Sequence, residues 1–117
     1  MRKYLLCLWL LAAAPLIDEF DLPLMPGLAE QADARMSFDK AEGRIVETLL
    51  EGQVPMQAAM DYYASALPGL GWTRADGGRM ADRQVYVRGS DRLIVDFAHK
   101  AGVTRVRLLL EPDEPRH

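Results

Sequence analysis

Arginine side chains recur at alternate positions in the C-terminal third of the sequence, in stretches expected to be strands. If Val85, Leu93 and Val106 face the core, five neighbouring side chains share the opposite face of the sheet. These five are Tyr86, Arg88, Arg92, Arg105 and Arg107. A guanidinium group presents five N–H donors in a rigid plane, and Tyr and Arg are frequent anchors of interfaces. The pattern therefore predicts a binding surface for an acidic protein segment or an anionic ligand.

The same charges have a simpler explanation. Asp96 lies on the middle one of the expected C-terminal strands, where it can pair with arginines on both flanking strands. Exposed cross-strand ion pairs are common in sheets and stabilise them by ~0.2–1 kcal/mol each. Two interpretations are therefore open: a binding surface, and a set of structural ion pairs.

Residues that could carry catalysis or bind a metal are scattered. His99 lies in an expected turn and His117 is the last residue, so they do not form a local metal-binding pair. Ser90 and His99 should lie at opposite ends of one strand, too far apart for a nucleophile and its base. Glu47 and Asp96 could act as paired carboxylates, but pairing with arginine explains both. We expect no metal, no cofactor and no catalytic residue.

Length and charge narrow the class of protein. The chain has 117 residues, half of them hydrophobic, which fits one globular domain. Its net charge is −3, and an acidic chain is poorly suited to neutralising the phosphates of nucleic acids or of anionic membrane surfaces. We therefore expect no nucleic-acid partner.

A helix is predicted over residues 55–67. Large side chains at spacings of four, three and four form one stripe along it: Met56, Met60, Tyr63 and Leu67. Pro55 suits the first helical position, where no backbone N–H is needed, and Pro68 cannot continue the helix. This helix should bury its large side chains against a sheet.

Residues at the end of this helix resemble a pattern in small exported bacterial domains of unknown function. The residues that carry the resemblance are Tyr62, Tyr63, Leu67, Pro68, Gly71 and Trp72. In those domains the usual pair is Phe-Tyr, so Tyr62 stands where Phe is usual. The resemblance implies a helix that leads into an antiparallel sheet, and it implies no activity.

Alternating apolar and polar residues predict the strands of that sheet. Residues 36–38 and 44–51 should form a hairpin, and residues 83–88, 92–98 and 103–111 a meander. An apolar face and a charged face on each meander strand are typical of a sheet that packs a helix on one side. The sequence thus predicts an α+β fold, an antiparallel sheet of four to six strands with the helix on one face.

The N-terminus has the features of a secretory signal. Arg2 and Lys3 precede an apolar run from Leu5 to Ile17, which as a helix would span only ~20 Å of a ~30 Å bilayer core. Residues 1–17 are therefore predicted to be a signal peptide of a periplasmic or exported protein. A short N-terminal anchor in the inner membrane is the alternative, and it would be the only contact with a membrane.

The rest of the chain is predicted to consist of a proline-containing segment, one folded domain and a tail. Residues 18–35 contain Pro23 and Pro26 and are expected to be extended. Residues 36–111 should form the single α+β domain, and residues 112–117 a flexible tail.

These features favour an exported, non-catalytic binding or accessory domain whose partner is an envelope protein or an anionic ligand. Two alternatives are open. The order of strand, helix and meander also describes the cystatin inhibitors, although Gln53-Val54-Pro55 does not supply their Q-x-V-x-G hairpin. The other alternative is an enzyme with a dispersed site, for which His99 is the residue to substitute.

Export is testable directly. We expect mass spectrometry of the protein recovered from an envelope fraction to show a chain that has lost its N-terminal apolar run. Recovery of the chain from soluble cytosol with Met1 intact would contradict the prediction.

Overall fold

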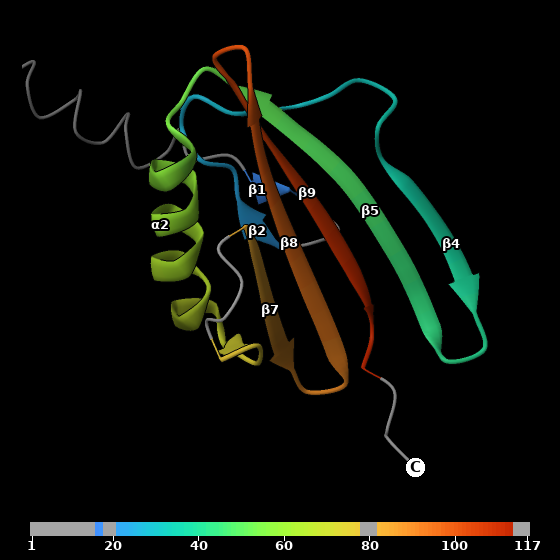
Figure 1. The fold of residues 1–117 in the computed structure, drawn as a ribbon. Coiled ribbons are helices and arrows are strands. Elements are labelled where there is room, and N and C mark those ends of the chain that lie inside the picture. Colours follow the sequence, from blue (N-terminus) through green and yellow to red (C-terminus); the bar gives the residue numbers. More distant parts are fainter. Residues whose placement is uncertain (1–15, 18–20, 78–81, 114–117) are drawn as a thin grey trace, which may run out of the picture.

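The helix α2 packs on one face of an antiparallel sheet (Figure 1). The structure is a computed structural model that describes residues 16–17, 21–77 and 82–113. In chain order its elements are β1 (Leu16–Ile17), β2 (Leu22–Pro23), β3 (Ala29–Glu30), β4 (Met36–Lys40), β5 (Gly43–Gly52), α2 (Met56–Ala66), the 3-10 helix η1 (Pro68–Leu70), β6 (Thr73–Arg74), β7 (Arg83–Arg88), β8 (Asp91–Lys100) and β9 (Val103–Pro112). The predicted α+β class is confirmed.

Within the described residues the main sheet has seven strands: six in the order β3-β5-β9-β8-β7-β6, and β4, which pairs with β5. The predicted hairpin is β4–β5 and the predicted meander is β7–β8–β9. The sheet exceeds the expected four to six strands because the two-residue strands β3 and β6 extend it. β5 pairs with β9, from Val46 opposite Leu110 to Gly52 opposite Thr104, so the last strand lies inside the sheet.

The face of the sheet toward α2, called here the inner face, carries the core. Its buried side chains alternate along three strands: Val46, Thr48 and Leu50 on β5, Leu93, Val95 and Phe97 on β8, and Val106 and Leu108 on β9. From the helix, Ala59, Tyr63 and Leu67 are buried among them, and Met56 and Met60 are partly buried. The predicted helical stripe therefore does face the sheet.

Tyr63 joins the helix to the segment that precedes the sheet. Its ring is fully buried, and its hydroxyl donates a hydrogen bond to the Pro23 carbonyl oxygen (3.1 Å) and accepts one from the Met25 N–H (3.4 Å). Burial raises the pKa of this hydroxyl far above its usual value, so it stays protonated and can donate. Leu22 and Leu28 enter the same core, so the proline-containing segment lies against the domain.

Two glycines allow this segment to reach the end of β5. A Cβ atom at Gly52 would lie 1.9 Å from the Gly27 carbonyl oxygen, a distance that no side chain tolerates. Gly27 itself has φ +96°, in the left-handed region that favours glycine. The close backbone approach of residues 27 and 52 holds Leu28 over the core.

The helix ends in the way that its sequence indicates. Pro68 begins η1, and Gly71 follows it with φ +94°, so the chain turns back toward the sheet. The Trp72 N–H donates to the Leu67 carbonyl oxygen (3.2 Å), and the Trp72 side chain is buried. This turn places Trp72 directly before β6.

Two sequence predictions concern residues outside the described ranges. The predicted signal peptide lies outside them except for Leu16–Ile17, and the predicted tail lies outside them beyond Asp113. β9 itself continues through Pro112, one residue past the expected boundary. No helix in the described part of the chain is long and apolar enough to cross a membrane.

The central position of Tyr63 generates a stability prediction. Tyr63→Ala should lower the free energy of unfolding by ~3 kcal/mol or more, because it removes a buried ring. Gln57→Ala should cost well under ~1 kcal/mol, because Gln57 is exposed and only bonds Asp61 on the helix surface. Denaturant melts of both variants test this, and equal losses would contradict the assigned buried face.

Candidate functional site

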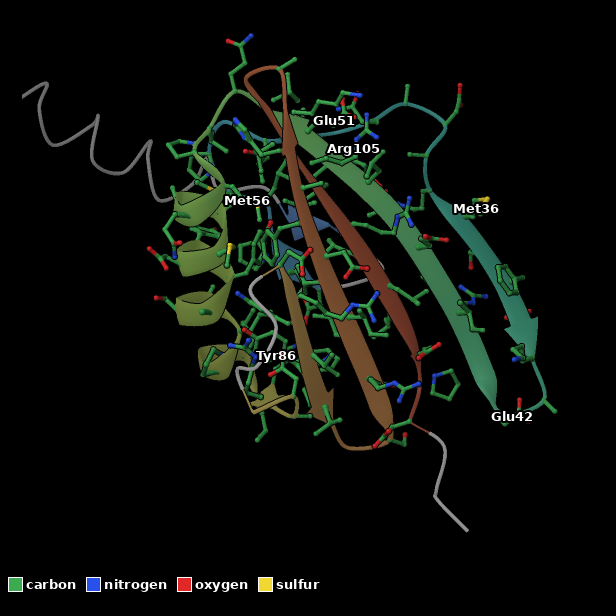
Figure 2. All side chains as sticks on the ribbon, in the orientation of Figure 1. Met36, Glu42, Glu51, Met56, Tyr86 and Arg105 are labelled. Atoms are coloured by element: carbon green, nitrogen blue, oxygen red, sulfur yellow. The ribbon has the colours of Figure 1, made fainter. Side chains whose placement is uncertain are left out.

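Three of the five predicted binding residues lie on the outer face, the side of the sheet away from α2. Each is paired with a glutamate on the neighbouring strand: Arg92 with Glu111 (2.5 Å), Arg105 with Glu51 (2.7 Å) and Arg107 with Glu47 (3.4 Å). The Arg105 and Arg107 side chains are each 57% exposed. The outer face therefore holds accessible guanidinium groups, but their charge is matched locally. Figure 2 shows one of these pairs, Arg105 beside Glu51.

A fourth pair completes the pattern. Arg83 binds Asp96 with two hydrogen bonds, of 2.6 and 3.3 Å, and these bonds raise the pKa of Arg83. Asp96 also stands opposite Arg107 in the register of β8 and β9. With four arginines matched by four carboxylates, the outer face has little net charge with which to attract a free anion.

The prediction that Tyr86 and Arg88 lie on the outer face is wrong. Tyr86 is 1% exposed and stands opposite Leu93 on the inner face. Arg88, two residues further along β7, lies on the same side, with its guanidinium 4.4 Å from the centre of the Trp72 ring. It also donates a hydrogen bond to the Leu70 carbonyl oxygen (3.0 Å). Both side chains belong to the packing between helix and sheet.

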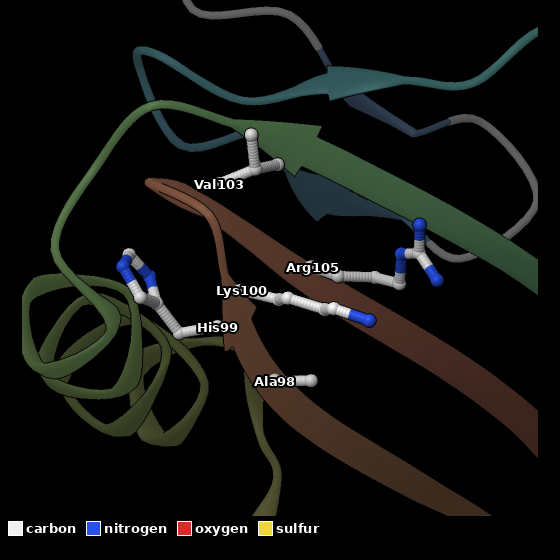
Figure 3. A pocket seen from close by; sticks show the side chains of 5 residues that line it. All are labelled: Ala98, His99, Lys100, Val103 and Arg105. Carbon is white, nitrogen blue, oxygen red and sulfur yellow. The ribbon is translucent and has the colours of Figure 1, made fainter.

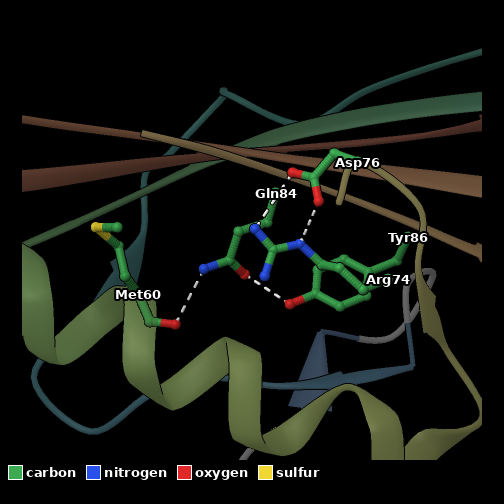
Figure 4. A network of polar contacts seen from close by, with 5 residues as sticks. All are labelled: Met60, Arg74, Asp76, Gln84 and Tyr86. Carbon is green, nitrogen blue, oxygen red and sulfur yellow. Dashed lines mark hydrogen bonds and ion pairs between the residues drawn. The ribbon is translucent and has the colours of Figure 1, made fainter. Parts of the chain in front are cut away.

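A polar network beneath the helix explains why this side of β7 faces inward (Figure 4). The Gln84 side chain donates to the Met60 carbonyl oxygen of α2 (3.1 Å) and accepts from the Tyr86 hydroxyl (2.7 Å). Burial raises the pKa of Tyr86, and the charge of Arg74 partly opposes that rise. Since Gln84 has partners for its amide and carbonyl groups, it can be buried while Val85 and Val87 point outward.

Outward-facing apolar side chains form a row across the meander. Val85 stands opposite Ile94, and Ile94 stands opposite Leu109. All three are half-buried. The row crosses β7, β8 and β9, between the ion pair of Arg92 and that of Arg83. Ile94 and Leu109 lie two residues from Arg92 and Arg107 on the same strands, so alternation places them on this face too. Only the inverted orientation of β7 adds Val85 to it.

A small cavity of about 160 Å3 lies at the end of the β8–β9 hairpin (Figure 3). Its lining consists of Ala98, His99, Lys100, Val103 and Arg105. Figure 3 shows Lys100 and Arg105 extending in the same direction, while His99 points to the other side of the strand. Only two cationic groups therefore converge, and one of them, Arg105, is bound to Glu51.

His99 has one defined contact, and it fixes the proton on the ring. Thr104 donates its single hydroxyl proton to the Val54 carbonyl oxygen (2.5 Å). The contact of 2.8 Å between His99 Nδ1 and the Thr104 hydroxyl oxygen therefore requires a proton on Nδ1. The Thr104 hydroxyl thus links the hairpin to Val54 in the loop before α2, and His99 supports this link, which is a structural role.

No catalytic grouping forms around the other candidates in the described residues. Ser90 precedes β8 and His99 is near its end, which separates them by ~30 Å at the rise of a β-strand. Glu47 and Asp96 each bind an arginine, Arg107 and Arg83 respectively. Within the described ranges no three His, Cys, Asp or Glu side chains are grouped so that they could hold a metal ion.

Comparison with known proteins places the chain in no family: no family model, no curated protein and no solved structure matches it. The resemblance around Tyr62–Trp72 stays a prediction.

The polar network generates the next prediction. Tyr86→Phe should lower the free energy of unfolding by ~1–2 kcal/mol, because it leaves the buried Gln84 oxygen without its donor. Tyr62→Phe makes the same chemical change on a partly exposed tyrosine of α2, and it should cost less than ~0.5 kcal/mol. Thermal or denaturant melts compare the two, and equal costs would show that the network does not stabilise the fold.

Proposed function

We propose that this chain is a non-catalytic binding domain of the periplasm or cell envelope, and that it contacts a partner protein through the outer face of its sheet. The observation that carries the proposal is the row of Val85, Ile94 and Leu109 between ion pairs. An apolar centre with a polar rim is the usual composition of a protein–protein interface. The row lies on paired strands, whose backbone is held by the sheet, so this surface is formed before the partner arrives.

The charge of the outer face supports a protein partner over an anionic ligand. A free anion would have to compete with Glu47, Glu51 and Glu111 for the arginines that they bind. A protein partner can bury the apolar row and leave the ion pairs at the rim. Rim charges mainly steer association and set specificity, and they contribute less to affinity.

Location in the envelope rests on sequence. The basic residues Arg2 and Lys3, followed by a short apolar run, are typical of a secretory signal. The acidic net charge agrees with a partner other than nucleic acid.

Charge substitution on the apolar row tests the proposed surface. Ile94→Lys and Leu109→Lys should abolish capture of a partner that the unmodified domain retains from envelope extract, because each places a charge in the centre of the interface. Gln57→Lys adds the same charge on the exposed side of α2 and should leave capture unchanged. Circular dichroism and melts confirm that the variants are folded. Undiminished capture by folded Ile94→Lys and Leu109→Lys would exclude this face.

A second variant separates the two kinds of partner. Arg105→Ala combined with Arg107→Ala should reduce capture only a few-fold if a protein binds the apolar row, because both residues lie on its rim. Complete loss of binding in this variant, with capture retained by Ile94→Lys, would favour an anionic ligand instead.

A further inference from the structure

The strand β4 leaves one edge of the sheet open. Among the described elements it pairs only with β5, and all five of its residues, Met36–Lys40, are exposed. Figure 1 shows β4 at the border of the sheet farthest from α2, with no described element on its outer side. Along such an edge, alternate residues direct their N–H and C=O groups away from the sheet, where another strand can bind them.

The side chains of β4 are unusual for an open edge. Of the three exposed large hydrophobic side chains in the described residues, two lie on this strand: Met36 is 53% exposed and Phe38 is 51% exposed. Both point to the outer face, because they stand opposite Glu47 and Ile45 of β5. Edge strands usually carry proline, a bulge or charged side chains against pairing. On β4 the charged residues, Asp39 and Lys40, lie at the end next to the turn, and the stretch from Met36 to Phe38 carries no charge.

We propose that a second copy of this chain binds here, with the two β4 strands antiparallel and Ser37 on the two-fold axis. In this register Met36 stands opposite the partner's Phe38, and Phe38 opposite the partner's Met36. Each copy thereby covers the other's two exposed apolar side chains. A two-fold interface requires such a self-complementary surface, and β4 supplies it within three residues.

Charge selects this register over its neighbours. It brings Asp39 opposite Arg35 of the partner subunit, twice, so that opposite charges meet on the inner face. Both side chains also bind a residue of their own chain: Arg35 donates two hydrogen bonds to Glu30 (2.7 and 2.6 Å), and Asp39 accepts one from Arg44 (3.2 Å). The contact between the two copies would therefore join these two ion pairs. A register with Asp39 on the axis would place two carboxylates face to face, and one with Phe38 on the axis would place Met36 against lysine. Like charges directly opposite each other destabilise a strand pair.

Cysteine cross-linking tests the register on the purified chain, with Cys7→Ser wherever Cys7 is present. Ser37→Cys should form a covalent dimer under mild oxidation, because residues opposite each other across antiparallel strands have Cα atoms within the range that a disulfide spans. Ser90→Cys is the matched control, since Ser90 is also an exposed serine but lies in the β7–β8 turn, with β5 and β9 between β8 and β4 in the sheet. Equal cross-linking of the two variants would overturn the proposal.

Sedimentation equilibrium tests the association without any cross-link. The unmodified chain should reach twice the monomer mass as its concentration rises, and Phe38→Lys should weaken this association by about tenfold, since it removes two symmetric apolar pairs. Gln57→Lys should not change it. A chain that stays monomeric at all concentrations, or a dimer that Phe38→Lys leaves unchanged, would overturn the proposal. Neither experiment includes another protein, so the outcome is independent of binding at the outer face.

Discussion

The contact of Tyr63 with the segment before the sheet is the interaction on which the rest of the core depends. The ring packs against the inner face from the helix, and the hydroxyl bonds Pro23 and Met25. Helix, segment and sheet therefore meet at one side chain. A phenylalanine could fill the same volume, but it would leave the Pro23 carbonyl oxygen and the Met25 N–H without this partner. The two hydrogen bonds thus explain why a tyrosine, with its polar end, occupies so deeply buried a position.

The two faces of the sheet have separate roles. The inner face packs against the helix. Even its polar side chains, Gln84, Tyr86 and Arg88, form their hydrogen bonds within the molecule: to the helix, to each other or to the turn that follows the helix. The outer face keeps its side chains at the surface, and its arginines are restrained by carboxylates. A restrained guanidinium group loses little conformational freedom when a partner covers it, and this lowers the entropic cost of binding. The ion pairs and the proposed interface are for this reason compatible.

Periodicity was sufficient for the parts of this fold in which polarity and burial agree. On β8, Leu93, Val95 and Phe97 share one face, while the charged residues Arg92 and Asp96 mark the other, so the burial of these three was predictable. On β7 the alternation predicted the wrong face. Val85 and Val87 are more apolar than Gln84, but the Gln84 side chain is buried because it donates a hydrogen bond to the Met60 carbonyl oxygen, 24 residues away in the sequence. A tertiary hydrogen-bond partner leaves no trace in the local pattern.

The candidate site was predictable to the same extent: Arg92, Arg105 and Arg107 were placed on the correct face. The pairing of Arg105 with Glu51 depends on β5 lying beside β9, which the alternation within each strand does not specify.

Because β9 lies inside the sheet, the strands cannot all pair in the order in which they are synthesised. During synthesis the hairpin β4–β5, the helix and the hairpin β7–β8 all leave the ribosome before β9, and each can form from local contacts. β5 and β8 have no contact with each other until β9 is inserted between them. Residues 22–28 are made before every strand of the main sheet, but the surface that they cover is completed last. A nascent chain of this topology therefore cannot close its core until β9 has been made, and before that point its hairpins and helix can form only as separate local elements.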